Sequence, residues 1–226
     1  MSTLTFTLLS RAGFHLSHTA RPILPEQYYL ALKRFFDLFA VLATAVFWLP
    51  LMLLCAALIK IDSFHGPVLF AQQRTGKGGK RFSMFKFRTM VPDAEERKAS
   101  LMHLNELKWP DFKITNDPRI TRVGRFLRKT SLDELPQLIN VLRGEMSLVG
   151  PRPTSFGPQT YSLWQTQRLD VCPGITGLWQ IIGRGSTEFD ERLRLDIAYI
   201  ERRSLSFDLQ ILFRTVPVLI TRKGAR

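Results

Sequence analysis

Residues 38–59 read LFAVLATAVFWLPLMLLCAALI, a run of 22 residues without a charged side chain. Lys33 and Arg34 precede the run and Lys60 follows it, so both flanks are basic. At about 1.5 Å per helical residue the run reaches roughly 33 Å, which is barely enough to cross a bilayer. Positive charge near a membrane segment stays on the cytoplasmic side, so a spanning helix would show it on one flank only. The charge pattern therefore favours a segment whose two ends lie on the same side of a membrane.

Pro50 lies inside this apolar run. Proline lacks a backbone N–H and clashes with the preceding turn, so it breaks or kinks a helix. We therefore predict a re-entrant membrane helix over residues 33–61, a helix-break-helix hairpin kinked at Pro50. Lipid offers no hydrogen-bond partner to the backbone groups freed at the break, and Thr44 or a neighbouring polar group is the candidate to satisfy them.

Three alternatives to the re-entrant helix fit the same run. A tilted single-span helix is possible because membrane helices tolerate proline. A buried core helix is disfavoured because the run is apolar all round rather than on one face. A cleaved signal peptide is disfavoured because the run starts late and no small-residue cleavage site follows it.

The 226-residue chain carries 32 Lys and Arg against 19 Asp and Glu, a formal net charge of +13. Such a charge favours anionic lipid headgroups, phosphorylated ligands or nucleic acid. No recognised nucleic-acid motif accompanies the basic stretches, so nucleic acid is not an expected partner. The two cysteines, one of them inside the apolar run, make a disulfide framework improbable and favour a reducing compartment for the soluble part.

The rest of the chain predicts an α+β fold that is mainly helical. Residues 1–32 form an N-terminal segment that is mobile or membrane-associated, and residues 62–226 form a cytoplasmic catalytic domain. Strands at 67–72 and 80–90 flank a Gly-rich turn and predict a small β-hairpin. Helices are predicted at 94–107, 123–129, 135–142, 189–203 and 207–222. The last of these is amphipathic, and its pattern fits the membrane interface and a core-packed helix equally well.

Asp133 and Glu134 are adjacent carboxylates in a strongly basic neighbourhood. Nearby cations lower the pKa of a carboxylate, and adjacent acids together with phosphate oxygens make a natural Mg²⁺ site. Pro136 belongs in the first turn of a helix, which puts Asp133 near a helix N-terminus that favours anions such as phosphate. The structural alternative is an N-cap at Asp133, or a capping box of Ser131 with Glu134.

Four further residues are weaker candidates from their local sequence. Arg152 lies between two prolines, which fits either a rigid phosphate clamp or a surface turn with an incidental Arg. Arg184 lies between two glycines in a similar loop. Lys86 belongs to an ordinary strand pattern, and Asp196 is expected to pair with Arg192 at helical spacing.

Five motifs in this order closely resemble the bacterial sugar transferases, the monotopic phosphoglycosyl transferases that start surface-glycan assembly. They are KRFFD at 33–37, KFRTM at 86–90, LDELPQL at 132–138, GPRP at 150–153 and PGITG at 173–177. The resemblance runs from Lys33 to the C-terminus, and the ordered set is highly specific. The chain resembles the short, exopolysaccharide-initiating galactose or glucose phosphotransferases, without the multi-span N-terminal region of long members.

The resemblance implies a monotopic membrane protein of the bacterial inner membrane with its catalytic domain on the cytoplasmic side. It implies that a UDP-sugar binds with Mg²⁺, that Asp133 attacks the sugar-linked phosphorus and releases UMP, and that undecaprenyl phosphate then takes the sugar-phosphate. It also implies that Glu134 helps hold the metal or assists deprotonation. Arg128, Arg152 and Arg184 match positions around the phosphates, and Lys86 and Asp196 match further active-site positions.

One departure from the family concerns the hairpin, where many members place Ser before the proline and this chain has Leu49. A non-catalytic, basic, membrane-anchored binding protein is the alternative function. It explains the charge and the apolar run but not the ordered motifs. A multi-span transferase without a covalent step would need several long apolar segments, whereas the sequence has one.

Overall fold

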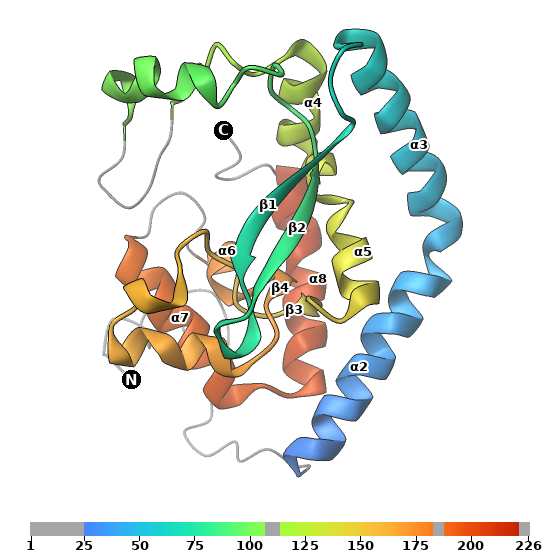
Figure 1. The fold of residues 1–226 in the computed structure, drawn as a ribbon. Helices are drawn as coiled ribbons and strands as arrows, with labels where there is room; N and C mark the ends of the chain where they lie inside the picture. The colour runs from blue at the N-terminus through green and yellow to red at the C-terminus, as the bar shows by residue number, and fades with distance from the viewer. Residues whose placement is uncertain (1–24, 107–113, 183–187, 222–226) are drawn as a thin grey trace.

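The computed structural model describes residues 25–106, 114–182 and 188–221. Most of this chain is helical, and two two-stranded sheets complete the fold (Figure 1). The prediction of a mainly helical protein with small sheets is confirmed. The N-terminal segment predicted over 1–32 lies largely outside the described residues, except that 26–32 already belong to the first described helix, α2 (Glu26–Ala43).

The apolar run forms the end of α2 and most of α3 (Ala45–Asp62). Thr44 separates the two helices, so the interruption lies six residues before Pro50, the predicted position, and Pro50 itself lies inside α3. Proline lacks the N–H that would bond the carbonyl of Val46 and its ring crowds that carbonyl. The missing hydrogen bond and the steric clash caused by Pro50 therefore fall in the first turns of α3, directly after the break.

Side chains near the break satisfy backbone groups of α2. The Thr44 hydroxyl donates to the carbonyl of Ala40 at 2.7 Å. The indole Nε1 of Trp48 donates to the carbonyl of Val41 at 2.9 Å, a group that in an uninterrupted helix would accept from the backbone N–H of Ala45. Thr44 was the expected partner, whereas the contribution of Trp48 was not foreseen.

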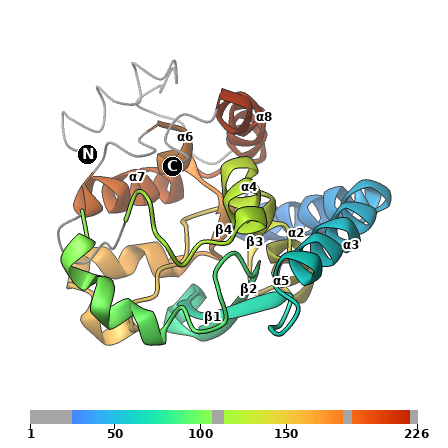
Figure 2. The same cartoon turned by 90° about the horizontal axis from the view of Figure 1, so that it is seen from above.

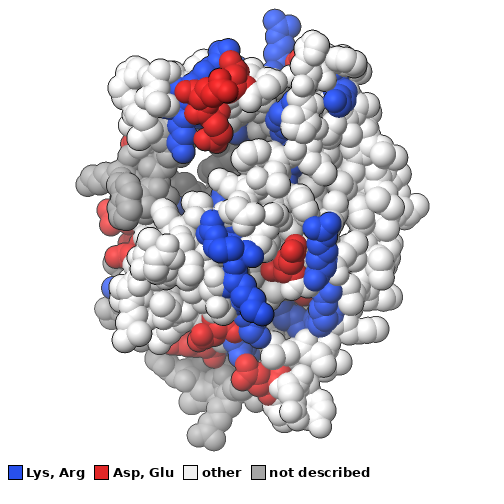
Figure 3. All heavy atoms as spheres, in the orientation of Figure 1, with Lys and Arg blue, Asp and Glu red and all other residues white. Residues whose placement is uncertain are grey.

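Figure 1 shows α2 and α3 as an open V along one side of the molecule, with its apex near the break pointing away from the body. Seen from above, the pair projects from one flank (Figure 2). By length and composition, α3 is the one helix of the described chain that could cross a membrane. Apolar side chains on both helices are exposed, among them Phe35, Phe39, Leu42, Val46, Phe47 and Leu53. In Figure 3 the outer edge along α3 is free of charged side chains.

The predicted hairpin is confirmed as β1 (Leu69–Thr75) and β2 (Arg81–Phe87), paired antiparallel. A second, parallel sheet of β3 (Ser147–Val149) and β4 (Gly174–Thr176) was not predicted, because three-residue strands show no readable alternation. The described helices after the hairpin are α4 (Arg122–Thr130), α5 (Gln137–Arg143), α6 (Leu178–Ile182), α7 (Phe189–Arg202) and α8 (Leu205–Thr221). The helix predicted over 94–107 is a 3-10 helix at Glu96–Leu104 without a buried residue.

Three clusters of buried apolar side chains hold these elements together. One joins β3, α6, α7 and α8, and Ile211 of α8 is fully buried in it. Another joins α2, β2 and α5 through Val41, Met84 and Val141. The third joins α3 to β2 and α4. One side of α8 is therefore core-packed, while its Phe213 and Val216 are exposed.

Polar contacts fasten α2 to the body as well. Asp208 of α8 accepts from Tyr29 and Lys33, each at 3.0 Å, and from Tyr199 at 2.6 Å. Arg34 donates to the last carbonyls of α5, at 2.6 Å to Val141 and 3.0 Å to Leu142. Cations suit the C-terminal end of a helix, where carbonyls lack intrahelical partners. These bonds fix α2 relative to α5, the helix that follows the two adjacent carboxylates.

Candidate active site

Asp133 and Glu134 lie in a single 3-10 turn, Leu132–Glu134, between α4 and α5. Ser131 ends α4 with φ +58°, the one non-glycine residue of the described chain in the left-handed region. This conformation is uncommon outside glycine and asparagine. It ends α4 and turns the chain into the 3-10 turn that carries both carboxylates. Pro136 follows as the N-cap of α5.

The capping box of Ser131 with Glu134 does not form, since the Ser131 side chain makes no capping bond in this turn. The Glu134 carboxylate instead binds two cations from other parts of the chain. Lys86 Nζ of β2 lies 2.9 Å from Oε1, and Arg152 Nη1 lies 3.1 Å from Oε2 while its Nη2 binds Oε1. Burial alone would raise the pKa of Glu134, but Arg152 and Lys86 outweigh it and hold that pKa far below its usual range.

Asp133 has a different environment from its neighbour. Its closest ion-pair partner among the described residues is Lys86 Nζ, at 4.0 Å from Oδ2. Burial raises the pKa of Asp133, Lys86 opposes that shift, and the negative charge of Glu134 adds to it, with a net result above the usual value. Adjacent carboxyl groups whose pKa values are pushed apart are suited to different roles. Glu134 is a fixed anion that orients two cations, whereas the ion pair that Asp133 forms with a described residue is the longer contact to Lys86.

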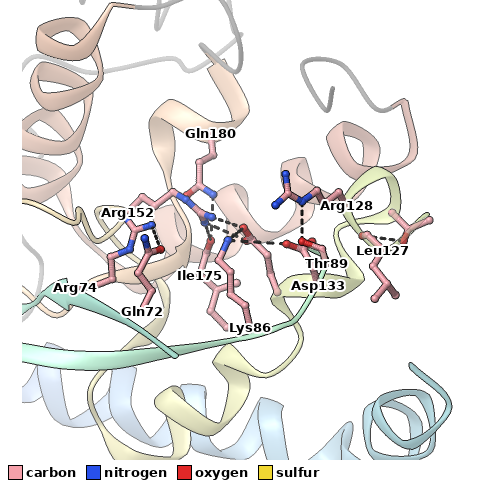
Figure 4. Close-up of polar contacts among 12 residues, drawn as sticks. Gln72, Arg74, Lys86, Thr89, Leu127, Arg128, Asp133, Arg152, Ile175 and Gln180 are labelled. Carbon is pink, nitrogen blue, oxygen red and sulfur yellow. Dashed lines mark hydrogen bonds and ion pairs between the residues drawn. The ribbon is translucent and has the colours of Figure 1, made fainter. Parts of the chain in front are cut away.

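Arg128, near the end of α4, lies on the other side of Asp133 (Figure 4). Its Nε donates to the hydroxyl of Thr89 at 2.8 Å. Burial lowers the pKa of Arg128, and the charge of Asp133 partly restores it. Gly124 permits this contact, because a Cβ on Gly124 would lie only 2.0 Å from the Thr89 carbonyl oxygen. The loop after β2 and helix α4 thus place a second cation beside Asp133.

The loop 150–153 presents Arg152 from the end of β3. Gly150 bonds across to β4, its N–H donating to the Thr176 carbonyl at 2.9 Å. Arg152 itself reaches toward the Ile175 carbonyl at 3.4 Å, beside the side chain of Gln180 (Figure 4). The small parallel sheet therefore serves to bring the two Gly- and Pro-rich loops together behind the carboxylates.

Asp196 does not pair with Arg192, its expected helical neighbour. It binds Arg168 instead, with Nη2 at 2.7 Å from Oδ2, and both side chains are almost fully buried. Arg168 Nη2 also donates to the backbone carbonyl of Arg152, at 2.5 Å. Burial raises the pKa of Asp196 to about 6, and Arg168 counters that shift. Asp196 therefore belongs behind the site, where it supports Arg152 through Arg168.

The structure brings together Asp133, Glu134, Lys86, Arg128 and Arg152, five of the predicted residues. Arg184 lies outside the described residues. Sequence reasoning missed Thr89 and Arg168. Thr89 belongs to the KFRTM motif, which could have pointed to it, whereas Arg168 lies in a segment without any local signal.

Each residue of the Glu134–Arg152 pair lines a cavity. One cavity, of about 450 Å³, is mostly polar and includes Arg152 in its wall. The other, of about 180 Å³, is mostly apolar, lies between α5, α6 and α8, and includes Glu134. The ion pair thus links the wall of a charged cavity to that of an apolar one.

The described residues contain no group of three or more His, Cys, Asp or Glu side chains that would form an all-protein metal site. Mg²⁺, however, is commonly bound by one or two carboxylates together with substrate phosphates. Asp133 fits that mode, because its ion pair to a described residue is the longer, 4.0 Å contact with Lys86, whereas Glu134 is held closely by both Lys86 and Arg152. The donor set is therefore compatible with Mg²⁺ bound jointly by protein and substrate.

Comparison with known proteins shows a match between residues 28–222 and the family described as bacterial sugar transferase. The chain is 42% identical over 207 residues to the galactosyl transferase CpsE of Streptococcus agalactiae, covering 88% of this chain and 44% of that protein. It is 40% identical over 198 residues to the exopolysaccharide production protein ExoY of Rhizobium meliloti, covering 85% and 87%.

It is also 44% identical over 204 residues to the UDP-glucose:undecaprenyl-phosphate glucose-1-phosphate transferase of Caulobacter vibrioides, covering 85% of this chain and 71% of that one. Relatives of the CpsE kind are more than twice as long as the segment they share with this chain. The match with the family extends over most of the chain and over every motif that builds the site. The chain belongs to the bacterial sugar transferase family.

Proposed function

We propose that the protein transfers a sugar-1-phosphate from a UDP-sugar to undecaprenyl phosphate and so initiates the assembly of an exopolysaccharide. The names of several relatives carry these substrates, among them the Caulobacter enzyme and the undecaprenyl-phosphate galactose phosphotransferase of Salmonella typhimurium. The observation that carries the proposal is the contrast between the two carboxylates. Glu134 is held by Lys86 and Arg152, and Asp133 beside it is left open in a cationic site.

In the proposed mechanism an Asp133 oxygen attacks the phosphorus that bears the sugar. A new O–P bond forms, the bond to the bridging diphosphate oxygen breaks, and UMP leaves with that oxygen. The phosphate of the lipid acceptor then attacks the same phosphorus, which gives undecaprenyl-diphosphate-sugar and returns Asp133 as a carboxylate. Splitting the transfer in this way lets one cationic site serve two large substrates in turn.

The surrounding cations have distinct tasks in this mechanism. Lys86, next to both carboxylates, favours ionised Asp133 against the effect of burial. Arg128 and Arg152, held on either side of the carboxylates, offset negative charge on the phosphoryl oxygens as it develops. Mg²⁺, held by Asp133 and the diphosphate, would neutralise further charge on the donor phosphates. Asp196 and Arg168 act at a distance by fixing the backbone of Arg152.

The lipid acceptor requires the site to lie at the membrane surface. We infer that the α2–α3 pair enters one leaflet of the bacterial inner membrane at its apex and returns, with both ends and the catalytic body on the cytoplasmic side. Exposed apolar side chains on both arms of the V support this placement, as does the basic charge on both flanks of the run.

The test is UMP release by the purified protein with Mg²⁺ across a panel of UDP-sugars, with and without undecaprenyl phosphate. We expect a burst of UMP without acceptor, and turnover once acceptor is added. Asp133→Asn keeps the size of the side chain but removes the nucleophile, so its burst should vanish. A burst that survives in this variant would eliminate Asp133 as the nucleophile. A folded parent protein that releases no UMP from any UDP-sugar would favour the non-catalytic binding protein.

A further inference from the structure

The polar cavity beside Arg152 has a strongly cationic wall. Its charged lining residues are five cations and one acid: Arg74, Lys98, Arg152, Arg168, Arg192 and Asp196. The one acid is already paired with Arg168. Arg152 is likewise paired, with Glu134, whereas Arg74 forms no ion pair with an acidic side chain of the described residues. An anion bound beside Arg74 would therefore meet a cation that no described carboxylate already neutralises.

Arg74 of β1 is the cation of this wall that lies next to Arg152 (Figure 4). Its guanidinium reaches Pro153 only weakly, with Nη1 at 3.4 Å from the carbonyl, and Nη2 donates to Gln72. Its Nε is buried and has no hydrogen-bond partner within the described chain. Burial lowers the pKa of Arg74 to about 10, and the charge of Arg152 lowers it further. Two guanidinium groups crowded together favour a ligand with more than one negative charge.

The part of the cavity wall other than its cations suits the nucleoside portion of a nucleotide. A cavity of about 450 Å³ lies within the range of small-molecule sites. Phe156, Trp179 and Phe189 contribute aromatic surface to it, beyond Arg74 and Arg152. Flat aromatic surfaces are a common platform for nucleobases. In Figure 4 Arg152 lies between the carboxylates and Arg74, and the aromatic side chains belong to the same cavity wall.

We propose that this cavity is the donor-nucleotide site, in which Arg74 binds the phosphate on the nucleoside side of the donor diphosphate. Arg152 then binds the phosphate that bears the sugar, and the nucleoside extends toward Trp179. The inference rests on the proposed function, because it assigns a binding site to the UDP-sugar donor of that reaction. It adds Arg74 as a substrate-binding residue that no sequence motif had indicated.

The two half-reactions allow a sharp test with Arg74→Gln. Loss of a charged hydrogen-bond donor to phosphate should raise the donor KM and the inhibition constant of UMP about 10- to 100-fold. Transfer from an isolated sugar-phosphate enzyme to undecaprenyl phosphate should proceed at the parental rate, because the nucleotide has already left. Arg74→Lys keeps the charge without the planar fork and should show a smaller rise.

Arg81→Gln is the matched control. Arg81 lies on the adjacent strand and binds the same loop, at 3.1 Å from the Ser155 carbonyl and 3.0 Å from the Phe156 carbonyl, but does not line the cavity. If Arg81→Gln raised the donor KM as much as Arg74→Gln does, the effect would act through the loop and the inference would be overturned.

The failure of this inference can be told apart from the failure of the proposed function. A parent protein that turns over, with Arg74→Gln showing the parental donor KM and UMP inhibition, would overturn the donor site alone. Equal slowing of both half-reactions in Arg74→Gln would also overturn it, because it would show general damage to the site. A parent that releases no UMP from any UDP-sugar would overturn the function itself.

Discussion

Glu134 and Asp133 are chain neighbours of the same charge, yet their environments differ. Glu134 accepts from Lys86 and Arg152 with both oxygens, whereas Asp133 has one distant ion pair. An ionised carboxylate that is fully engaged stabilises the fold, and one that is buried with few partners costs stability. We therefore expect a structural role for Glu134 and the reactive role for Asp133.

This division predicts opposite effects of two conservative substitutions on stability. Glu134→Gln leaves Lys86 and Arg152 without their anion and should lower the free energy of unfolding by about 1–3 kcal/mol. Asp133→Asn removes a charge that burial disfavours and should leave stability unchanged or slightly higher. Thermal unfolding of the two variants in the same detergent measures the difference. Equal destabilisation by both would contradict the division of roles.

The dependence of stability on pH follows from the same two groups. The pKa of Glu134 is depressed in the folded state, so its contribution is present above the unfolded pKa near 4.5 and is lost as the pH falls below that value. The pKa of Asp133 is raised in the folded state, so ionising Asp133 costs stability, and this cost appears as the pH rises through its unfolded and then its folded pKa. Below pH 5 the parent should therefore lose stability relative to Glu134→Gln.

At the scale of elements, the break between α2 and α3 is stabilised by side chains rather than by a serine before Pro50. Trp48 donates its indole N–H to the Val41 carbonyl and Thr44 donates its hydroxyl to the Ala40 carbonyl. Leu49, directly before Pro50, has no polar side-chain group, and the tryptophan one residue earlier supplies the hydrogen bond.

Trp48→Phe should therefore weaken the break while keeping an aromatic ring of similar shape. The Val41 carbonyl would lose its shorter hydrogen bond and keep only the Thr44 hydroxyl at 3.4 Å. We expect a loss of about 0.5–1.5 kcal/mol, or more if the break lies in lipid. Phe47→Leu is the control, because Phe47 is 73% exposed and donates no side-chain hydrogen bond. Thermal unfolding in nanodiscs compares them. A Trp48→Phe variant as stable as Phe47→Leu would show that the bond contributes nothing.

At the scale of the whole molecule, one set of contacts ties α2 to the body that carries the candidate site. Arg34 of α2 holds the end of α5, and Asp208 of α8 binds Lys33 and Tyr29 of α2. Asp133 and Glu134 lie in the turn that leads into α5. These contacts therefore fix the candidate site relative to the exposed apolar side chains of α2 and α3, and in the proposed membrane placement they would set the height of the site above the bilayer.

The re-entrant placement predicts that both ends of the V face the same compartment. Single cysteines at Tyr28 and Phe64, which are 57% and 75% exposed, mark the two ends in a variant with Cys55→Ala and Cys172→Ser. A membrane-impermeant maleimide should label both in inside-out vesicles and neither in intact spheroplasts. Labelling of one end from each side would establish a spanning helix instead.

The sequence by itself determined the helical class, the hairpin and the identity of most of the site. These features rest on local signals: the uncharged run, the Gly-rich turn between two strands, and the motifs around Asp133 and Arg152. Each is encoded within a few residues, where periodicity, turn chemistry and charge act directly on the chain. The bounds of α4, α5, α7 and α8 differ from the predicted ranges by only a few residues for the same reason.

Only the tertiary structure decided where the break lies, which carboxylate is engaged and what supports Arg152. Pro50 marks a region of strain, but Trp48 and Thr44 determine which turn opens. Asp196 has a helical neighbour of opposite charge, yet it binds Arg168, which is 28 residues away in sequence. Partners of this kind depend on how α7 packs against the segment that carries Arg168. Burial and long-range pairing are properties of the folded chain, and no local pattern of residues specifies them.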